Sequence, residues 1–75
     1  MNKDKKQLIT ILIELNLLID LFLFDNINIK NKTQELIILL YTINPRGSYN
    51  KIMTYNDSQL RQFITLNLNK LFEEV

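Results

Sequence analysis

Ser48 and Lys51 are the residues whose types and spacing come nearest to a catalytic motif in this 75-residue chain. In the Ser-x-x-Lys pattern, a lysine amine takes the proton of the serine hydroxyl and makes it a nucleophile. The tetrapeptide stands alone here, and so short a chain has no room for an oxyanion hole, a substrate cleft and a second motif. We therefore interpret the match as chance.

Glu14 and Asp20 are the next candidates, because a pair of carboxylates can perform general acid–base chemistry. They are six residues apart, which on a helix directs them to different sides. The chain has no Cys and no His, which excludes a disulfide framework, a zinc finger, a thiol nucleophile and imidazole chemistry. One Gly allows no glycine-rich phosphate loop, and the eight carboxylates show no EF-hand spacing. We predict that the chain is not an enzyme and has no metal, no cofactor and no small-molecule substrate.

The composition is that of one small globular domain, residues 1–75, with 47% hydrophobic and 23% charged residues. A net charge of +1 does not by itself indicate nucleic acid or an anionic membrane as partner. Ten Asn, seven Lys and no Ala are typical of an AT-rich gene, such as that of a mobile element or a virus, so a single Asn or Lys carries little information. We expect a cytoplasmic protein, or one inside a host cell.

The N-terminal segment superficially resembles a signal peptide, because Lys3, Lys5 and Lys6 precede an apolar run over Leu8–Phe24. Glu14 interrupts that run, no small-residue cleavage site follows, and 17 residues is the lower limit for a membrane span. We therefore expect neither a signal peptide nor a membrane helix. A membrane-associated peptide is kept as a third functional class.

Hydrophobic spacing predicts a first helix over residues 3–25 with two opposed apolar stripes. One stripe has the 4,3,4,3 spacing of a helix pair and consists of Leu8, Leu12, Leu15, Ile19 and Phe22. The second lies nearly opposite and consists of Ile13, Leu17, Leu21 and Phe24. A helix with two apolar faces must be covered twice. Either the other helices sandwich it, or the second stripe is an association surface for a protein partner or a homodimer, which is the interpretation we adopt.

The rest of the chain predicts further helices. Residues 26–32 read as a polar connection in which Asn31 and Gln34 form a capping box. A central, buried helix over 33–43 follows and ends because of Pro45. A turn at 44–48 and a short helix over 48–55 lead to a capping cluster at 56–58.

A last helix runs from there to Phe72, and its inner face is Leu60, Phe63, Ile64, Leu68 and Leu71. The predicted fold is thus all-α, a small helical bundle of three main helices plus one short helix.

Two other surfaces could bind a partner. The segment 46–55 gathers residue types that are enriched at interfaces or adapt to them, namely Arg46, Tyr49, Met53 and Tyr55. These side chains could instead close the end of the bundle.

The outward side of the last helix carries amides, hydroxyls and flanking cations that could contact base edges and phosphates: Ser58, Gln59, Arg61, Gln62, Thr65, Asn69 and Lys70. The order of elements over 33–72 resembles a helix-turn-helix core, although the turn at 56–59 is longer and more polar than that motif prefers. A neutral, solvated face is the other interpretation.

Small domains bury too little surface to be more than marginally stable alone, which favours self-association or a partner helix. We therefore expect a non-enzymatic protein–protein interaction or regulatory protein that docks an apolar helix surface on a partner or on itself. The alternative is a small dimeric, helix-turn-helix-like DNA-binding regulator.

Overall fold

The computed structural model describes residues 3–21 and 26–73 of the chain. Three α-helices and one 3-10 helix follow one another: α1 (Lys3–Asp20), α2 (Asn26–Ile43), η1 (Asn50–Thr54) and α3 (Asp57–Glu73). No strand occurs in the described ranges. The expected all-α bundle of three main helices and one short helix is confirmed.

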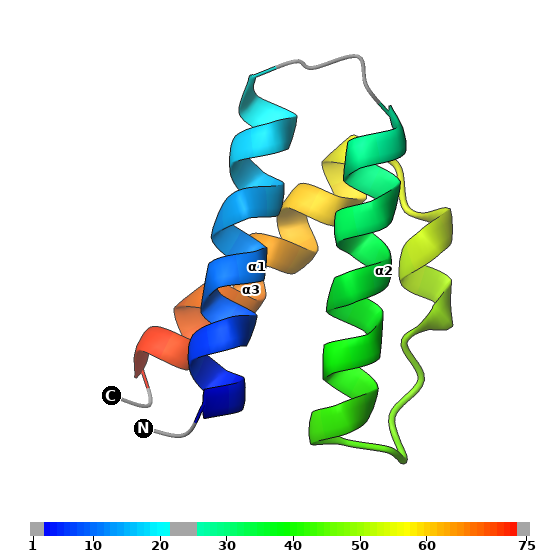
Figure 1. The fold of residues 1–75 in the computed structure, drawn as a ribbon. Coiled ribbons are helices and arrows are strands. Elements are labelled where there is room, and N and C mark those ends of the chain that lie inside the picture. The colour runs from blue at the N-terminus through cyan, green and yellow to red at the C-terminus, as the bar shows by residue number, and fades with distance from the viewer. Residues whose placement is uncertain (1–2, 22–25, 74–75) are drawn as a thin grey trace.

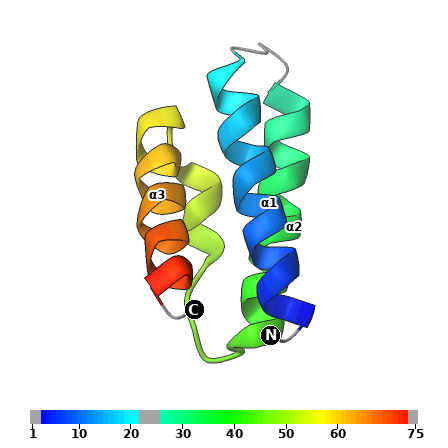
Figure 2. The ribbon, with the colours of Figure 1, turned by 90° about the vertical axis from the view of Figure 1, so that its left-hand side faces the viewer.

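The helices form two layers. Helices α1 and α2 are an antiparallel pair, and α3 crosses this pair on one side, with η1 in the same layer (Figures 1 and 2). Helix α1 packs against both α2 and α3, whereas α2 packs mainly against α1 and η1. The central helix is therefore α1. The expectation that the helix over 33–43 is central is wrong, because its apolar residues surround it but the bundle covers only one side of it.

That uncovered side is visible in the side chains of α2. Ile38 is exposed at 66% of its surface, while Leu36 and Leu40 on the opposite side are buried; Ile43, the last residue of the helix, is exposed at 45%. A helix apolar around most of its circumference is usually covered on all sides. Here the sequence provides more apolar surface than the three other elements can cover.

One apolar core holds the two layers together. Leu12, Leu15, Leu36 and Ile64 are its most completely buried side chains. The predicted seam of α1 is confirmed at four of its positions: Leu8, Leu12, Leu15 and Ile19 are all buried in the core. Its fifth member, Phe22, lies outside the described residues. From α3, Leu60 and Ile64 are buried, and the rest of the predicted inner face packs partly buried against them: Phe63, Leu68 and Leu71.

Helix α2 begins earlier than the sequence indicates. The predicted connection over 26–32 is wrong, because α2 starts at Asn26 and Asn31 lies inside it rather than capping it. Within this first part of α2, Ile29 packs against the core and accepts a hydrogen bond of 2.7 Å from the buried hydroxyl of Thr33. Tertiary packing thus overrides the low helix propensity of an Asn-rich stretch. Helix α1 in turn ends at Asp20 rather than residue 25.

The predicted end of the helix before Pro45, with a turn after it, is confirmed. Helix α2 ends at Ile43, the amide of Asn44 still donates to the Leu40 carbonyl at 2.8 Å, and the amide of Gly47 donates back to the Asn44 carbonyl at 3.1 Å. A Cβ on Gly47 would overlap the Tyr49 ring. A larger residue at this position would therefore have to displace the tyrosine ring.

The start of α3 has the predicted cap. The Gln59 amide donates to Asn56 Oδ1 at 2.8 Å, and the Asn56 amide donates to Gln59 Oε1 at 3.0 Å. These two reciprocal bonds form a capping box that satisfies amides left open at a helix start. The preceding segment is a 3-10 helix rather than the two-turn helix predicted over 48–55, and it places Ile52 in the core.

Candidate functional site

The outer face of α1 is the main uncovered apolar stripe of that helix, and we define it as Ile13, Leu17 and Leu21, the last of which directly follows α1 and still donates its amide to the Leu17 carbonyl. Their exposed fractions are 50%, 54% and 56%. Each lies four residues after the previous one, so they form one stripe on the side opposite the core seam. Figure 2 looks onto α1, with α2 behind it and α3 beside it. The predicted second stripe is therefore exposed at three of its positions, and the fourth, Phe24, lies outside the described residues.

A hollow of about 280 Å³ adjoins this face on the side of α2. It has an apolar side and a polar side, and is lined by Glu14, Leu17, Leu18, Leu21, Asn28 and Lys32. Two of the three residues of the outer face are thus also walls of the hollow. The same surface therefore carries both projecting side chains and a recess of a size that one aliphatic side chain could enter.

Ion pairs border the outer face on both sides. Towards α2, Lys32 Nζ lies 2.7 Å from a Glu14 oxygen and 2.9 Å from a Glu35 oxygen. Towards α3, Arg61 lies 2.5 Å from a carboxylate oxygen of Asp20. The expectation that the two acids of α1 point to different sides is confirmed, because each binds a different helix. These contacts link α1 to each of its two neighbouring helices at the surface.

The ammonium of Lys32 is held in its charged form. Hydrogen bonds from it to Glu14 and then to Glu35 raise the pKa of Lys32 above its ordinary 10.5, and partial burial opposes this only in part. A lysine so held is a cation at neutral pH and no proton acceptor. Among residues 3–21 and 26–73, no cluster of three or more acidic side chains is placed to hold a metal ion. What the arrangement can do is bind apolar surface between two charged borders.

The structure places the second predicted patch partly in the core. The rings of Tyr49 and Tyr41 meet edge-on with their centroids 5.0 Å apart, and the backbone amide of Tyr49 donates to the Tyr41 hydroxyl at 3.1 Å. Tyr55 meets Phe63 edge-on at 6.3 Å. Both tyrosines pack against the core, while Arg46 and Met53 are exposed. The two tyrosines thus pack η1 onto the bundle, one against α2 and one against α3, and a partner contact at this patch stays a prediction.

The predicted nucleic-acid face of α3 is divided in the same way. Arg61 is half-buried, is paired with Asp20 and donates to Asn16 Oδ1 at 3.4 Å. Gln59 belongs to the capping box. The other five side chains lie on the surface: Ser58, Gln62, Thr65, Asn69 and Lys70. Leu66, 68% exposed, lines a hollow together with Asn69 and Lys70.

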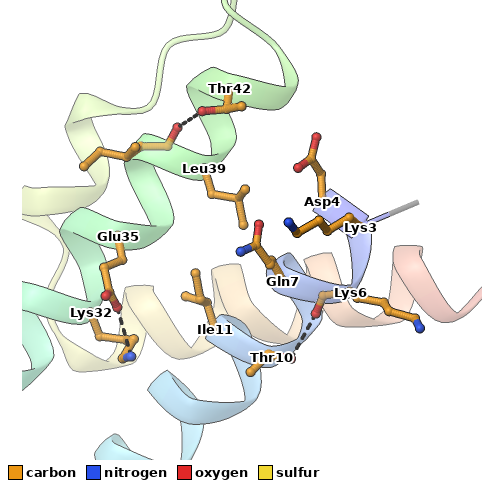
Figure 3. A pocket seen from close by; sticks show the side chains of 11 residues that line it. Lys3, Asp4, Lys6, Gln7, Thr10, Ile11, Lys32, Glu35, Leu39 and Thr42 are labelled. Carbon is orange, nitrogen blue, oxygen red and sulfur yellow. Dashed lines mark hydrogen bonds and ion pairs between the residues drawn. The ribbon is translucent and has the colours of Figure 1, made fainter. Parts of the chain in front are cut away.

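Sequence reasoning missed a second depression, between the start of α1 and the end of α2 (Figure 3). It measures about 630 Å³, and its walls are Lys3, Asp4, Lys6, Gln7, Thr10, Ile11, Lys32, Glu35, Ile38, Leu39 and Thr42. The hydroxyls of Thr10 and Thr42 both donate to their own helices. Both positively and negatively charged side chains line the groove, so it favours neither an anionic nor a cationic ligand. No sequence signal marks this groove, because it depends on how α1 and α2 are aligned.

No protein-family model matches the chain, and neither the curated proteins nor the solved structures include one that is similar to it. In the helices that the structure describes, none is both long enough and apolar enough to cross a membrane.

Proposed function

We propose that this chain is a non-enzymatic interaction or regulatory protein, which acts by docking the outer face of α1 onto apolar helix surface of another polypeptide. The observation that carries the proposal is that Ile13, Leu17 and Leu21 keep half of their surface exposed after the bundle has formed. Soluble proteins commonly expose single apolar residues, whereas an ordered stripe beside an apolar hollow is typical of a binding surface.

The size of this surface sets the strength of the interaction. Complete burial of an exposed aliphatic side chain contributes about 1.5–3 kcal/mol, so covering the remaining half of three such residues contributes roughly 3 kcal/mol. A micromolar complex requires about 8 kcal/mol. The partner must therefore also fill the hollow and contact the flanks of α1. Such binding is reversible, as a regulatory contact needs to be.

Binding of DNA by α3 is less well supported. Helix α3 contains two basic residues, Arg61 and Lys70, and Arg61 is already paired with Asp20. Phosphate contacts provide most of the affinity of a DNA-binding protein, and one remaining lysine provides little. No observation favours this function, so we treat DNA binding as an outcome of the test.

The test is site-specific photo-crosslinking in cells that express the protein. A benzoylphenylalanine at Leu17 should form a discrete adduct with one protein species, either a different protein or a second copy of the chain. The same probe at Leu66, a leucine on α3 that is even more exposed than Leu17, is the matched control and should not form that adduct. Ile13→Asp should remove the adduct from position 17. Equal labelling from both positions would contradict the proposal, and nucleic-acid adducts from Gln62 would favour the alternative.

A further inference from the structure

We propose that the occupant of the outer face of α1 is the same face of a second copy of this chain, with the two α1 helices antiparallel about a twofold axis. This inference rests on the proposed function and names its partner. Three features of the described residues carry it: the spacing and shape of the face, its charge distribution, and the surface area of the chain.

The exposed side chains lie along one side of α1. Ile13, Leu17 and Leu21 follow one another at intervals of four residues, and the exposed polar residue Thr10 precedes them by three. A twofold interface must also fit itself, because the same patch is used by both copies. On the outer face, projecting side chains adjoin the hollow of about 280 Å³, so each copy has both a projection and a recess to offer the other. In an antiparallel pair, Ile13 of each copy lies beside Leu17 of the other.

Charge selects the antiparallel direction. The first turn of α1 carries three lysines and one aspartate, whereas its later part carries the acids Glu14 and Asp20. In an antiparallel pair with Ile13 beside Leu17, Asp20 of one copy lies opposite Thr10 of the other, one helical turn from Lys6, and the two helix macrodipoles run in opposite directions. Glu14 and Asp20 keep their ion pairs with Lys32 and Arg61 within each copy. A parallel pair would instead bring like charges together along its length. With a net charge of +1, two whole chains repel one another only weakly.

The exposed area matches what such a pair requires. The chain exposes 5457 Å². A compact monomer of this mass would expose about 4,900 Å², so the excess is about 600 Å². A small but specific interface buries about 1,200 Å² in total, which is about 600 Å² from each copy. The whole elongated chain thus exposes more surface than a compact monomer of its mass, and the excess is of the size that one half of a small dimer interface buries.

The first experiment is light scattering of the purified full chain over a concentration series. We expect the mass to rise from 9.0 kDa to twice that value as concentration increases. Leu17→Asp should raise the dissociation constant at least ten-fold with unchanged helix content by circular dichroism, whereas Leu66→Asp should leave it unchanged. Leu17→Gln, a milder change, should weaken association in the same direction and serves if Leu17→Asp fails to fold.

The second experiment tests direction and uses the absence of cysteine from the chain. Thr10→Cys and Leu21→Cys should form a disulfide-linked dimer when the two variants are mixed, but not when either is oxidised alone. Efficient cross-linking of each variant with itself would show a parallel pair and overturn the proposal.

A wild-type chain that keeps the mass of one copy up to millimolar concentration would also overturn it. In that case a photo-adduct from Leu17 with a different protein would leave the proposed function standing. Absence of both results would contradict the proposed function as well.

Discussion

Leu12 and Ile13 are neighbours in the chain with opposite surroundings. Leu12 is completely buried between the layers, whereas half of Ile13 is exposed on the outer face of α1. Removal of buried methyl groups costs both their transfer free energy and the cavity left behind. The same truncation on the surface removes contacts that solvent largely replaces. Two successive residues of α1 therefore belong to different environments, Leu12 to the core and Ile13 to the proposed interface.

The two positions give the first prediction. Leu12→Ala should lower the free energy of unfolding by about 2–5 kcal/mol, and Ile13→Ala by less than about 1 kcal/mol. Chemical denaturation at a protein concentration at which the chain is monomeric measures both unfolding free energies without a contribution from association. Equal losses at the two positions would mean that the outer face of α1 is part of the core.

The paired ammonium of Lys32 gives a pH-dependent prediction. Because Glu14 and Glu35 raise its pKa above 10.5, the folded chain binds this proton more tightly than the unfolded chain does. The resulting stability is fully present below pH 10.5 and is lost as the pH rises through the folded-state pKa. Since the groups are partly exposed, we expect Lys32→Met to cost on the order of 0.5 kcal/mol at pH 7.

The difference between wild type and Lys32→Met is the quantity to measure, because contributions of all other groups to the pH dependence are common to the two proteins. We expect this difference in unfolding free energy to shrink above pH 10.5. A difference that grows with pH would show that the lysine is not stabilised as a cation.

At the scale of single residues, sequence periodicity predicts which apolar side chains are buried but not which polar ones meet. The seam of α1 and the inner face of α3 were predictable because burial follows helix period. The pairing of Arg61 with Asp20 was not, since it depends on how two helices distant in sequence are aligned. For the same reason Arg61 was assigned to a DNA-facing surface, although it contacts α1.

Among the helices, the capping signals show where local reasoning holds and where it does not. Two asparagines, Asn31 and Asn56, each precede a glutamine by three residues. Only Asn56 is a cap. Asn31 lies inside α2, which starts five residues earlier and in which the Thr33 hydroxyl donates to the Ile29 carbonyl. The start of a helix depends on tertiary packing as well as on the cap residue. The sequence of a short polar segment does not reveal which of its residues will pack against the core.

The two asparagines therefore form a matched pair for mutation. Asn56→Ala should lower the free energy of unfolding by about 1 kcal/mol, because the Gln59 amide loses its partner. Asn31→Ala should be neutral or stabilise by about half a kcal/mol, since alanine has the higher propensity inside a helix. Thermal denaturation of the two variants at equal concentration distinguishes these results. A clear loss of stability in Asn31→Ala would place a helix start at that residue.

Across the whole molecule, the fold class was predictable and the arrangement was not. Three apolar helices in 75 residues leave few alternatives to a small bundle. Which helix is central depends on where α3 crosses, and the most apolar helix, α2, turned out to be partly uncovered. The outer face of α1 could be predicted as a stripe, whereas the adjoining hollow and the groove in Figure 3 arise from the alignment of α1 with α2.

The shape of the molecule explains why part of α1 stays open. The principal extents are 34 × 23 × 18 Å, an elongated body of two thin layers. Helix α1 uses its seam and both flanks to hold α2 and α3, and the described chain provides no further element for its fourth side. If a second copy covers that side, folding and association are coupled.

This coupling predicts that thermal stability depends on protein concentration. Binding that occurs only in the folded state raises stability by mass action. For a dimer of chains of this size, the melting temperature should rise by roughly 5 °C for each ten-fold increase in concentration. Leu17→Asp should melt at a temperature independent of concentration, and Leu66→Asp should follow the wild type. If the melting temperature of all three proteins is independent of concentration, the folded chain is not stabilised by a second copy. The exposed stripe of α1 would then have to be covered by a different protein.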